Sequence, residues 1–332
     1  MKKTNIMIRT IGGKNKSNNI GLGHIHRITN LLENFNLINS YCVLEDFGNA
    51  EKNLNRKKFK EIIRIKKKIN VDQDIEITKK IIQEKNIDLI IVDKFPLNHK
   101  YTKEIKKMCK LVIISDLKNI EYDADLIING FIGYKNKSIT NSKNVKCLLG
   151  PKFQIINKKF QRKSKVQKKY DLLVTLGGSN EKKIIKVIRN IHKKMGNILK
   201  IKIILGPAYI DAKKISKQKN LKIIEKTCNM KKEIESAKFG ICGGGITTYE
   251  FASMKIPFAI VSVSRHQLIT ARKWEKYGMK NLGAKSSVSE AKIEKIMLNL
   301  ANTKKFPKSQ IKIDGKGGIR VTKEIMKLIS NN

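Results

Sequence analysis

Residues 171–180, DLLVTLGGSN, decide the fold that this sequence predicts. An apolar strand runs directly into a glycine turn, and a helical stretch follows over residues 181–193. The first half of the chain already contains a series of strands and helices, and the same pattern restarts here. A polar, basic stretch at residues 157–170 separates the two series and is the candidate linker between domains.

Continuous Val, Ile and Leu runs that alternate with helices are typical of a parallel sheet covered on both faces. In the first half we expect strands at 4–11, 40–44, 87–93, 111–115 and 125–128, and helices at 24–34, 75–85 and 99–109. In the second half we expect further strands at 201–205, 221–224, 238–242 and 257–262, and helices at 230–237, 246–254, 266–277, 288–301 and 317–330.

The simplest architecture for this pattern is α/β, with two Rossmann-like, doubly wound domains in series, residues 1–156 and 171–332. Ligands of such sheets bind at the carboxyl ends of the strands, near the point where the strand order reverses. We therefore expect the two sheets to face a central cleft.

The chain of 332 residues has a formal net charge of +43. Its lysines are spread along the whole sequence rather than gathered in one tail, and no nucleic-acid-binding signature accompanies them. We therefore expect no specific nucleic-acid partner. The surplus of positive charge still attracts anionic small substrates, and it favours a weak association with anionic membrane surfaces.

The cysteines and the N-terminal segment indicate a reducing, cytoplasmic setting. The five cysteines are dispersed and form no CxxC pair, which argues against disulfides or a zinc knuckle. The N-terminal MKKTNIMIRTIGG begins like a signal peptide, but Arg9 interrupts its apolar run and no cleavage site follows. We interpret it as a first strand.

Three glycine-rich segments each follow a predicted strand and open a predicted helix, where backbone N–H groups favour phosphate. In the first, GLGHIHR at 21–27, Gly21 and Gly23 allow a ligand to approach the backbone, and His24 and Arg27 share a helix face. A histidine at a helix start tends to stay neutral, as a general base must be. From spacing alone, a helix cap or a surface residue explains His24 slightly better than a catalytic role.

The second segment is LGGSN at 176–180, where Gly177, Gly178 and Ser179 can bind phosphate or simply form a capped turn. The third, GGGITTYE at 243–250, carries successive glycines that are costly unless the backbone needs a special conformation. Glu250 is placed to accept both hydroxyls of a ribose, although a carboxylate is also favourable near a helix start.

Acidic and polar side chains also follow other strands. Asp93 and Asp116 each end a strand, where a carboxylate can bind a sugar hydroxyl or orient a base. For Asp116 we expect a solvated strand end. His266 and Gln267 open a helix after the strand at 257–262 and can contact nucleotide or sugar. The histidines are too dispersed to predict a metal site, and no cofactor is indicated.

These motifs occur in the order GLGHIHR, LIIVD, LGGSN and GGGITTYEF, then a proline and HQ. In this order the sequence resembles the UDP-2,4-diacetamido-2,4,6-trideoxy-β-L-altropyranose hydrolases of pseudaminic acid biosynthesis, which are related to spore-coat polysaccharide proteins. The resemblance covers roughly residues 4–285 and extends more loosely to the glycosyltransferase that makes lipid II. It implies the GT-B fold.

The resemblance also implies roles. His24 matches the histidine that activates water at the anomeric carbon, in a reaction without a metal. The second domain holds UDP, with the diphosphate at Gly244 and Gly245 and the ribose at Glu250. Besides His24, the expected site residues are Gly21, Gly23, Arg27, Asp93, Phe95, Gly177, Gly178, Ser179, Gly244, Gly245, Ile246, Thr247, Glu250, His266 and Gln267.

One departure concerns the sugar side. Many hydrolases of the family carry His-Tyr after the strand LIIVD, whereas this chain has Lys94 and Phe95. The resemblance implies a monomeric hydrolase that releases UDP from a UDP-diacetamido-trideoxy hexose in nonulosonic acid biosynthesis. The alternatives are a GT-B glycosyltransferase that uses a UDP-sugar donor, and a non-catalytic nucleotide or polyanion binder.

Overall fold

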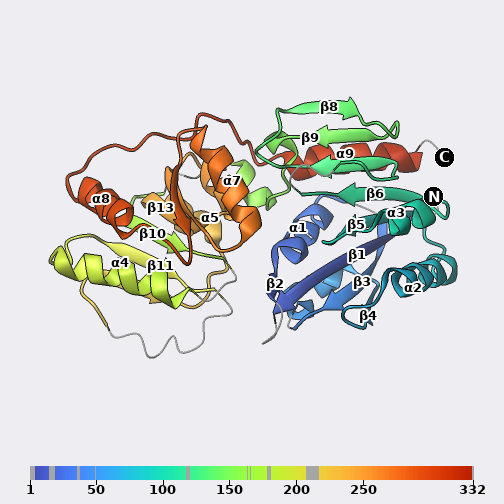
Figure 1. The fold of residues 1–332 in the computed structure, drawn as a ribbon, viewed down its shortest axis with the longest axis horizontal. Helices are drawn as coiled ribbons and strands as arrows, with labels where there is room; N and C mark the ends of the chain where they lie inside the picture. The colour runs from blue at the N-terminus through green and yellow to red at the C-terminus, as the bar shows by residue number, and fades with distance from the viewer. Residues whose placement is uncertain are drawn as a thin grey trace. The chain divides into compact units, whose positions relative to one another are not determined.

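The computed structural model describes residues 4–14, 19–35, 38–48, 50–116, 120–162, 164, 166–177, 181–206 and 217–330. The chain forms two compact units (Figure 1). Unit 1 comprises Met1–Lys158 and Gly315–Asn332, and unit 2 comprises Lys159–Asp314. Each contains one largely parallel β-sheet with helices on both faces, which confirms the predicted α/β class.

The sheet of unit 1 has the strand order β4-β3-β1-β5-β6-β7-β9-β8, with β2 added beside β1. Its strands are β1 (Thr4–Lys14), β2 (Asn19–Gly21), β3 (Ile38–Asp46), β4 (Glu61–Ile65), β5 (Leu89–Asp93), β6 (Lys110–Ile114), β7 (Leu126–Asn129), β8 (Lys137–Thr140) and β9 (Lys146–Leu149). Only the β1–β2 and β8–β9 pairs are antiparallel within the described range. The strand order reverses between β1 and β5, where Thr10 lies beside Asp93.

Side chains alternate between the two faces of this sheet. Ile8 and Ile91 pack on one face together with Ile28 of α1 (Gly23–Leu32) and Ile325 of α9 (Gly317–Ser330). Their neighbours in the strands face the other way, toward α2 (Val71–Glu84) and α3 (His99–Lys106). Asp93 continues the alternation of Leu89 and Ile91, so it belongs to the face that α1 covers.

The sheet of unit 2 is parallel throughout, with the order β12-β11-β10-β13-β14-β15 of a Rossmann domain. Its strands are β10 (Tyr170–Thr175), β11 (Ile201–Ile204), β12 (Leu221–Ile224), β13 (Ala237–Gly243), β14 (Phe258–Ser262) and β15 (Lys280–Ala284). Its helices are α4 (Lys182–Lys194), α5 (Met230–Glu235), α6 (Thr247–Ser253), α7 (Arg265–Glu275) and α8 (Glu290–Ala301).

Helices cover both faces of this second sheet as well. Residues of α4 and α8 pack with Val174 and Ile241 on one face. On the other, the buried ring of Trp274 meets Phe258 and Tyr249, each with ring centroids 5.3 Å apart. The order reverses between β10 and β13, so the turns after these two strands meet at one point of the carboxyl edge.

The predicted division of the chain needs two corrections. The last helix, expected in the second domain, belongs to unit 1, where α9 (red) lies among the first unit's elements (Figure 1). Its buried Val321 and Ile325 cover the same sheet face as α1. The predicted linker at 157–170 contains the boundary between the units after Lys158, but most of it belongs to unit 2, where Phe160 is buried and Ser164 bonds Glu235.

The strands β2, β4, β8, β9 and β15 were not predicted. They are short or lie at a sheet edge, and their residues are mostly polar or alternate weakly. Short 3-10 helices lie at Glu51–Asn53, Arg56–Lys58, Pro151–Phe153 and Lys158–Gln161. Among the described residues, no helix has the length and apolar character needed to span a bilayer.

The placement of α9 predicts which unit depends on it. Ile325→Ala should lower the free energy of unfolding of unit 1 by about 2–5 kcal/mol, because it leaves a cavity in that core. Ile319→Ala, on the exposed side of the same helix, should change it by less than about 0.5 kcal/mol. Hydrogen exchange of backbone amides, resolved by segment, measures the free energy of unfolding of each unit separately. Equal effects of both variants, or a loss confined to unit 2, would contradict this assignment.

Candidate active site

Four side chains of unit 1 converge at the carboxyl edge of its sheet. Nδ1 of His24 lies 2.6 Å from Oδ1 of Asp93. Arg27 donates from Nε to Oδ2 of Asp93 at 2.8 Å, and from Nη2 to Oδ1 of the same carboxylate. On its other side Arg27 donates to both oxygens of Asp116, at 2.7 and 3.1 Å. We call these four residues the His24 cluster.

Local structure explains this convergence. His24 and Arg27 lie one turn apart on α1, so they share a helix face as predicted. His26 is exposed and points elsewhere. Asp93 ends β5 on the face covered by α1, and Thr10 of the neighbouring strand donates to its backbone carbonyl at 3.0 Å. The switch point of the sheet therefore brings together residues from distant parts of the chain.

Electrostatics assign the protons of the cluster. Burial alone would raise the pKa of Asp93, but Arg27 and His24 outweigh it and lower the pKa to about 2. Asp93 is therefore a carboxylate near neutral pH, and the hydrogen between it and His24 belongs to Nδ1. The remaining ring nitrogen, Nε2, can then accept a proton. The His24 side chain is 14% exposed, so water can reach it.

A second charged network lies on the opposite face of the same sheet. The fully buried Arg9 donates to Asp74 and to Glu45, both at 2.9 Å, and Lys94 pairs with Asp74. Arg9 precedes Thr10 and Lys94 follows Asp93, so alternation sends these neighbours to opposite faces. Lys94, which departs from the family pattern, thus belongs to a buried scaffold behind the site.

The structure corrects the expectation for Asp116. Its side chain is 47% exposed, but it is not merely a solvated strand end, because Arg27 donates two hydrogen bonds to it. Asp116 follows β6 on the same face as Asp93, and alternation along two neighbouring strands could have revealed the pairing.

The glycines that precede His24 leave open space. Gly21 has a φ of +78°, which favours glycine, and a Cβ added at Gly21 or Gly23 would meet nothing within 4 Å. Phe95 is 49% exposed. The backbone at Gly21 and Gly23 is therefore open to close approach.

In unit 2 the two predicted glycine turns lie next to each other. Gly177 has a φ of +73° and open space around it, while a Cβ at Gly243 would lie 3.3 Å from the backbone oxygen of Leu176. This proximity follows from the neighbouring positions of β10 and β13. Gly178 and Ser179, also expected at this site, lie outside the described residues.

Gln267 supports the triple-glycine turn from within. Its Oε1 accepts from the backbone N–H of Gly244 at 2.9 Å and of Val263 at 3.1 Å. A Cβ at Gly244 would lie 2.9 Å from that of Gln267, so the turn requires glycine here. The Gly244 N–H, expected to hold phosphate, is thus used inside the protein, and Gln267 braces the turn.

The remaining expected residues surround the start of α6. Ile246 and Thr247 are partly exposed there, whereas Thr248 is buried and donates to the carbonyl of Gly245. Burial raises the pKa of Glu250 to about 7, and its carboxylate has no hydrogen bond or ion pair to another described residue. His266 is exposed in the first turn of α7.

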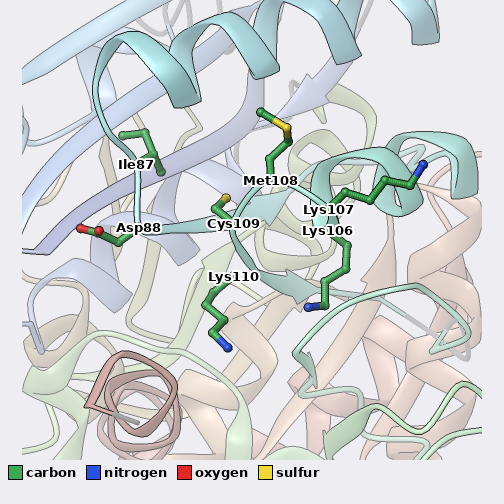
Figure 2. Close-up of a pocket in the computed structure, with 7 residues that line it drawn as sticks. All are labelled: Ile87, Asp88, Lys106, Lys107, Met108, Cys109 and Lys110. Carbon is green, nitrogen blue, oxygen red and sulfur yellow. The ribbon is translucent and has the colours of Figure 1, made fainter. Parts of the chain in front are cut away.

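A separate hollow of about 370 Å³ lies at the opposite edge of the first sheet (Figure 2). Asp88 precedes β5 and Lys110 opens β6, so this hollow is at the amino ends of the strands and away from the His24 cluster. Its lining residues are Ile87, Asp88, Lys106, Lys107, Met108, Cys109 and Lys110.

Across the described ranges, no group of three or more His, Cys, Asp or Glu residues is placed to hold a metal ion.

Comparisons with known proteins agree with this fold. The model of the glycosyltransferase family 28 C-terminal domain matches residues 172–325. The spore coat polysaccharide biosynthesis protein SpsG of Bacillus subtilis is 27% identical over 324 residues, covering 91% of this chain and 93% of SpsG.

Solved structures match over nearly the whole chain. The MurG structure of Acinetobacter baumannii has a TM-score of 0.66 at 13% identity, covering 99% of this chain and 100% of MurG. The UDP-GlcNAc 2-epimerase of Methanocaldococcus jannaschii, solved in complex with UDP-GlcNAc and UDP, has a TM-score of 0.60 at 15% identity, covering 98% of this chain and 100% of the epimerase.

The lowered pKa of Asp93 predicts how stability depends on pH. Because the folded-state pKa of about 2 lies below the ordinary value of about 3.9, the carboxylate stabilises the fold above pH 4, and this contribution disappears as the pH falls toward 2. Asp93→Asn should therefore cost about 2 kcal/mol at pH 7 and progressively less below pH 4.

Urea unfolding between pH 2 and 7 checks this expectation. Asp72→Asn, which removes a carboxylate that is 65% exposed, serves as the control and should change stability by less than about 0.5 kcal/mol. A cost for Asp93→Asn that stays constant across this pH range would refute the assigned role.

Proposed function

We propose that this chain, which is similar to SpsG and shares its fold with MurG, is a GT-B enzyme that hydrolyses a UDP-activated sugar. The observation that carries this proposal is the 2.6 Å contact between His24 and the buried Asp93 at the switch point of unit 1. A carboxylate that holds one imidazole nitrogen protonated leaves the other free to act as a general base.

The proposed reaction uses this base on water. Nε2 of His24 takes a proton from water as the water oxygen attacks the anomeric carbon, and Asp93 stabilises the resulting imidazolium. The bond from the anomeric carbon to the phosphate oxygen breaks, and UDP leaves with its electron pair. Arg27 keeps the Asp93 carboxylate in place through two hydrogen bonds.

We propose that unit 2 holds the nucleotide. The adjoining turns at Gly177 and at Gly243–Gly245 occupy the switch point where such folds bind ligands. Glu250 supports a ribose site, because its partly exposed carboxylate has no hydrogen bond or ion pair to another described residue and could accept from two hydroxyls. The related fold of the epimerase that was solved with UDP is consistent with this placement.

For the sugar we propose a UDP-diacetamido-trideoxy hexose of nonulosonic, pseudaminic-type acid biosynthesis, with the protein acting as a cytoplasmic monomer. Support comes from the ordered motifs around His24 and from the likeness to SpsG. The departure at Lys94 does not weaken this proposal, since Lys94 pairs with Asp74 on the other face. Phe95 offers the sugar an exposed ring without a hydroxyl.

A second candidate function is transfer of the sugar to an acceptor. The match of residues 172–325 to the C-terminal domain of a glycosyltransferase family favours it. The two candidates differ in what accepts the sugar, so UDP release in the absence of any added acceptor distinguishes them.

The first test follows UDP and free sugar from a panel of UDP-linked diacetamido sugars in buffer alone. We expect release by the wild type, and a loss of about 10²- to 10⁴-fold in kcat for His24→Ala, because a general base contributes that much. UDP affinity should persist. His26→Ala, an exposed histidine on the same helix, is the matched control. UDP release that requires an acceptor would favour transfer. No UDP release with or without an acceptor would contradict both hydrolysis and transfer.

The second test concerns Glu250. Glu250→Gln should weaken UDP binding about 10- to 100-fold, because hydrogen bonds to a charged carboxylate are lost. Since burial raises the Glu250 pKa to about 7, above the ordinary value of about 4.3, the stability cost of its ionisation grows between these pH values, and the variant should gain much more stability at pH 8 than at pH 5.

Calorimetric titration with UDP and with uridine, together with unfolding at both pH values, measures these effects. The exposed Glu294→Gln in α8 should change neither quantity. Unchanged UDP affinity in Glu250→Gln would exclude Glu250 from the nucleotide site.

A further inference from the structure

The Arg27 guanidinium is held on two edges at once. Its Nε and Nη2 donate to Asp93, and its Nη1 and Nη2 donate to Asp116. Both pairs have the two-pronged geometry that fixes a guanidinium in position and plane. Because the side chain of Arg27 is only 11% exposed, its orientation depends on these two carboxylates.

The two carboxylates occupy different environments. Asp93 is fully buried and touches His24, whereas Asp116 is 47% exposed, is linked to His24 by hydrogen bonds through Arg27, and also acts on it through its charge. Without Asp116, one edge of the guanidinium would face solvent and could swing away from Asp93. Asp93 would then lose the partner that holds its oxygen toward Nδ1 of His24.

The net charge of the His24 cluster also indicates a role for Asp116. Two carboxylates and one guanidinium leave a net charge of −1 beside the neutral imidazole, and protonation of His24 brings the total to zero. Removal of Asp116 leaves Arg27 balanced by Asp93 alone, so a protonated His24 would carry an uncompensated positive charge. Asp116 therefore favours the imidazolium that a base forms during proton transfer.

We propose that Asp116 is a positioning residue for His24, acting through Arg27 to hold Asp93 and to supply the negative charge that stabilises protonated His24. The catalytic part of this proposal rests on the proposed function, since it concerns a base that acts on a UDP-sugar. The structural part concerns the protonation of the His24 imidazole, which can be measured without substrate.

The first experiment uses ¹H–¹⁵N spectra of the histidine side chains in the full chain, with His24 identified by the signal lost in His24→Gln. In Asp116→Asn the Nδ1–H form should decline relative to the Nε2–H form, because Asp93 no longer holds its oxygen toward Nδ1. Asp116→Glu should restore part of the effect, and Asp72→Asn should have none. Identical His24 spectra in the wild type and Asp116→Asn would overturn the proposal.

The second experiment measures UDP release by the same variants. Asp116→Asn should lower kcat about tenfold, with KM within about twofold, because the loss falls on proton transfer rather than on binding. A raised KM with unchanged kcat would overturn the positioning role and make Asp116 a substrate ligand. If the spectra change as stated but the wild type cleaves no UDP-sugar, the proposed function fails and the structural inference stands.

Discussion

The buried carboxylate of Asp93 is the constraint around which unit 1 is organised. A carboxylate with no exposure must be paired, or burial would force it to take up a proton. Arg27 and His24, one turn apart on α1, provide the pairing, and Thr10 holds the adjacent carbonyl. The position of α1 on the sheet, the order of the strands and the state of the imidazole are therefore linked through one side chain.

In unit 2 the candidate site is held by backbone hydrogen bonds rather than by ion pairs. The turn after β13 passes so close to Gln267 that Gly244 has no room for a Cβ, and the amide of Gln267 fastens the turn through two backbone N–H groups. The partly exposed carboxylate of Glu250 has no hydrogen bond or ion pair to another described residue. One unit thus presents a charged, proton-accepting group, and the other a tightly braced loop with an unsatisfied acceptor.

Much of this arrangement could be predicted from the sequence. The buried strands and most helices are marked by long apolar periodicity, and placing a glycine segment after a strand correctly put His24, Asp93 and the triple-glycine turn at carboxyl edges. Pairings across the sheet could not be predicted in the same way. Asp116 looked like a solvated strand end because its partner lies 89 positions earlier in the chain. Gln267 looked like a ligand contact because its two backbone partners depend on loop conformation. The last helix has an apolar stripe that fits either sheet, so periodicity alone could not assign it to unit 1.

The return of α9 to unit 1 makes that unit discontinuous, while unit 2 consists of one continuous stretch. During synthesis from the N-terminus, every residue of unit 2 leaves the ribosome before the last helix of unit 1 does. Until that helix arrives, the apolar face shared by Ile8, Ile91 and Ile28 lacks part of its cover. Unit 1, which carries His24, is therefore completed only when α9 arrives, and loss of that helix leaves unit 2 whole but exposes the core of unit 1.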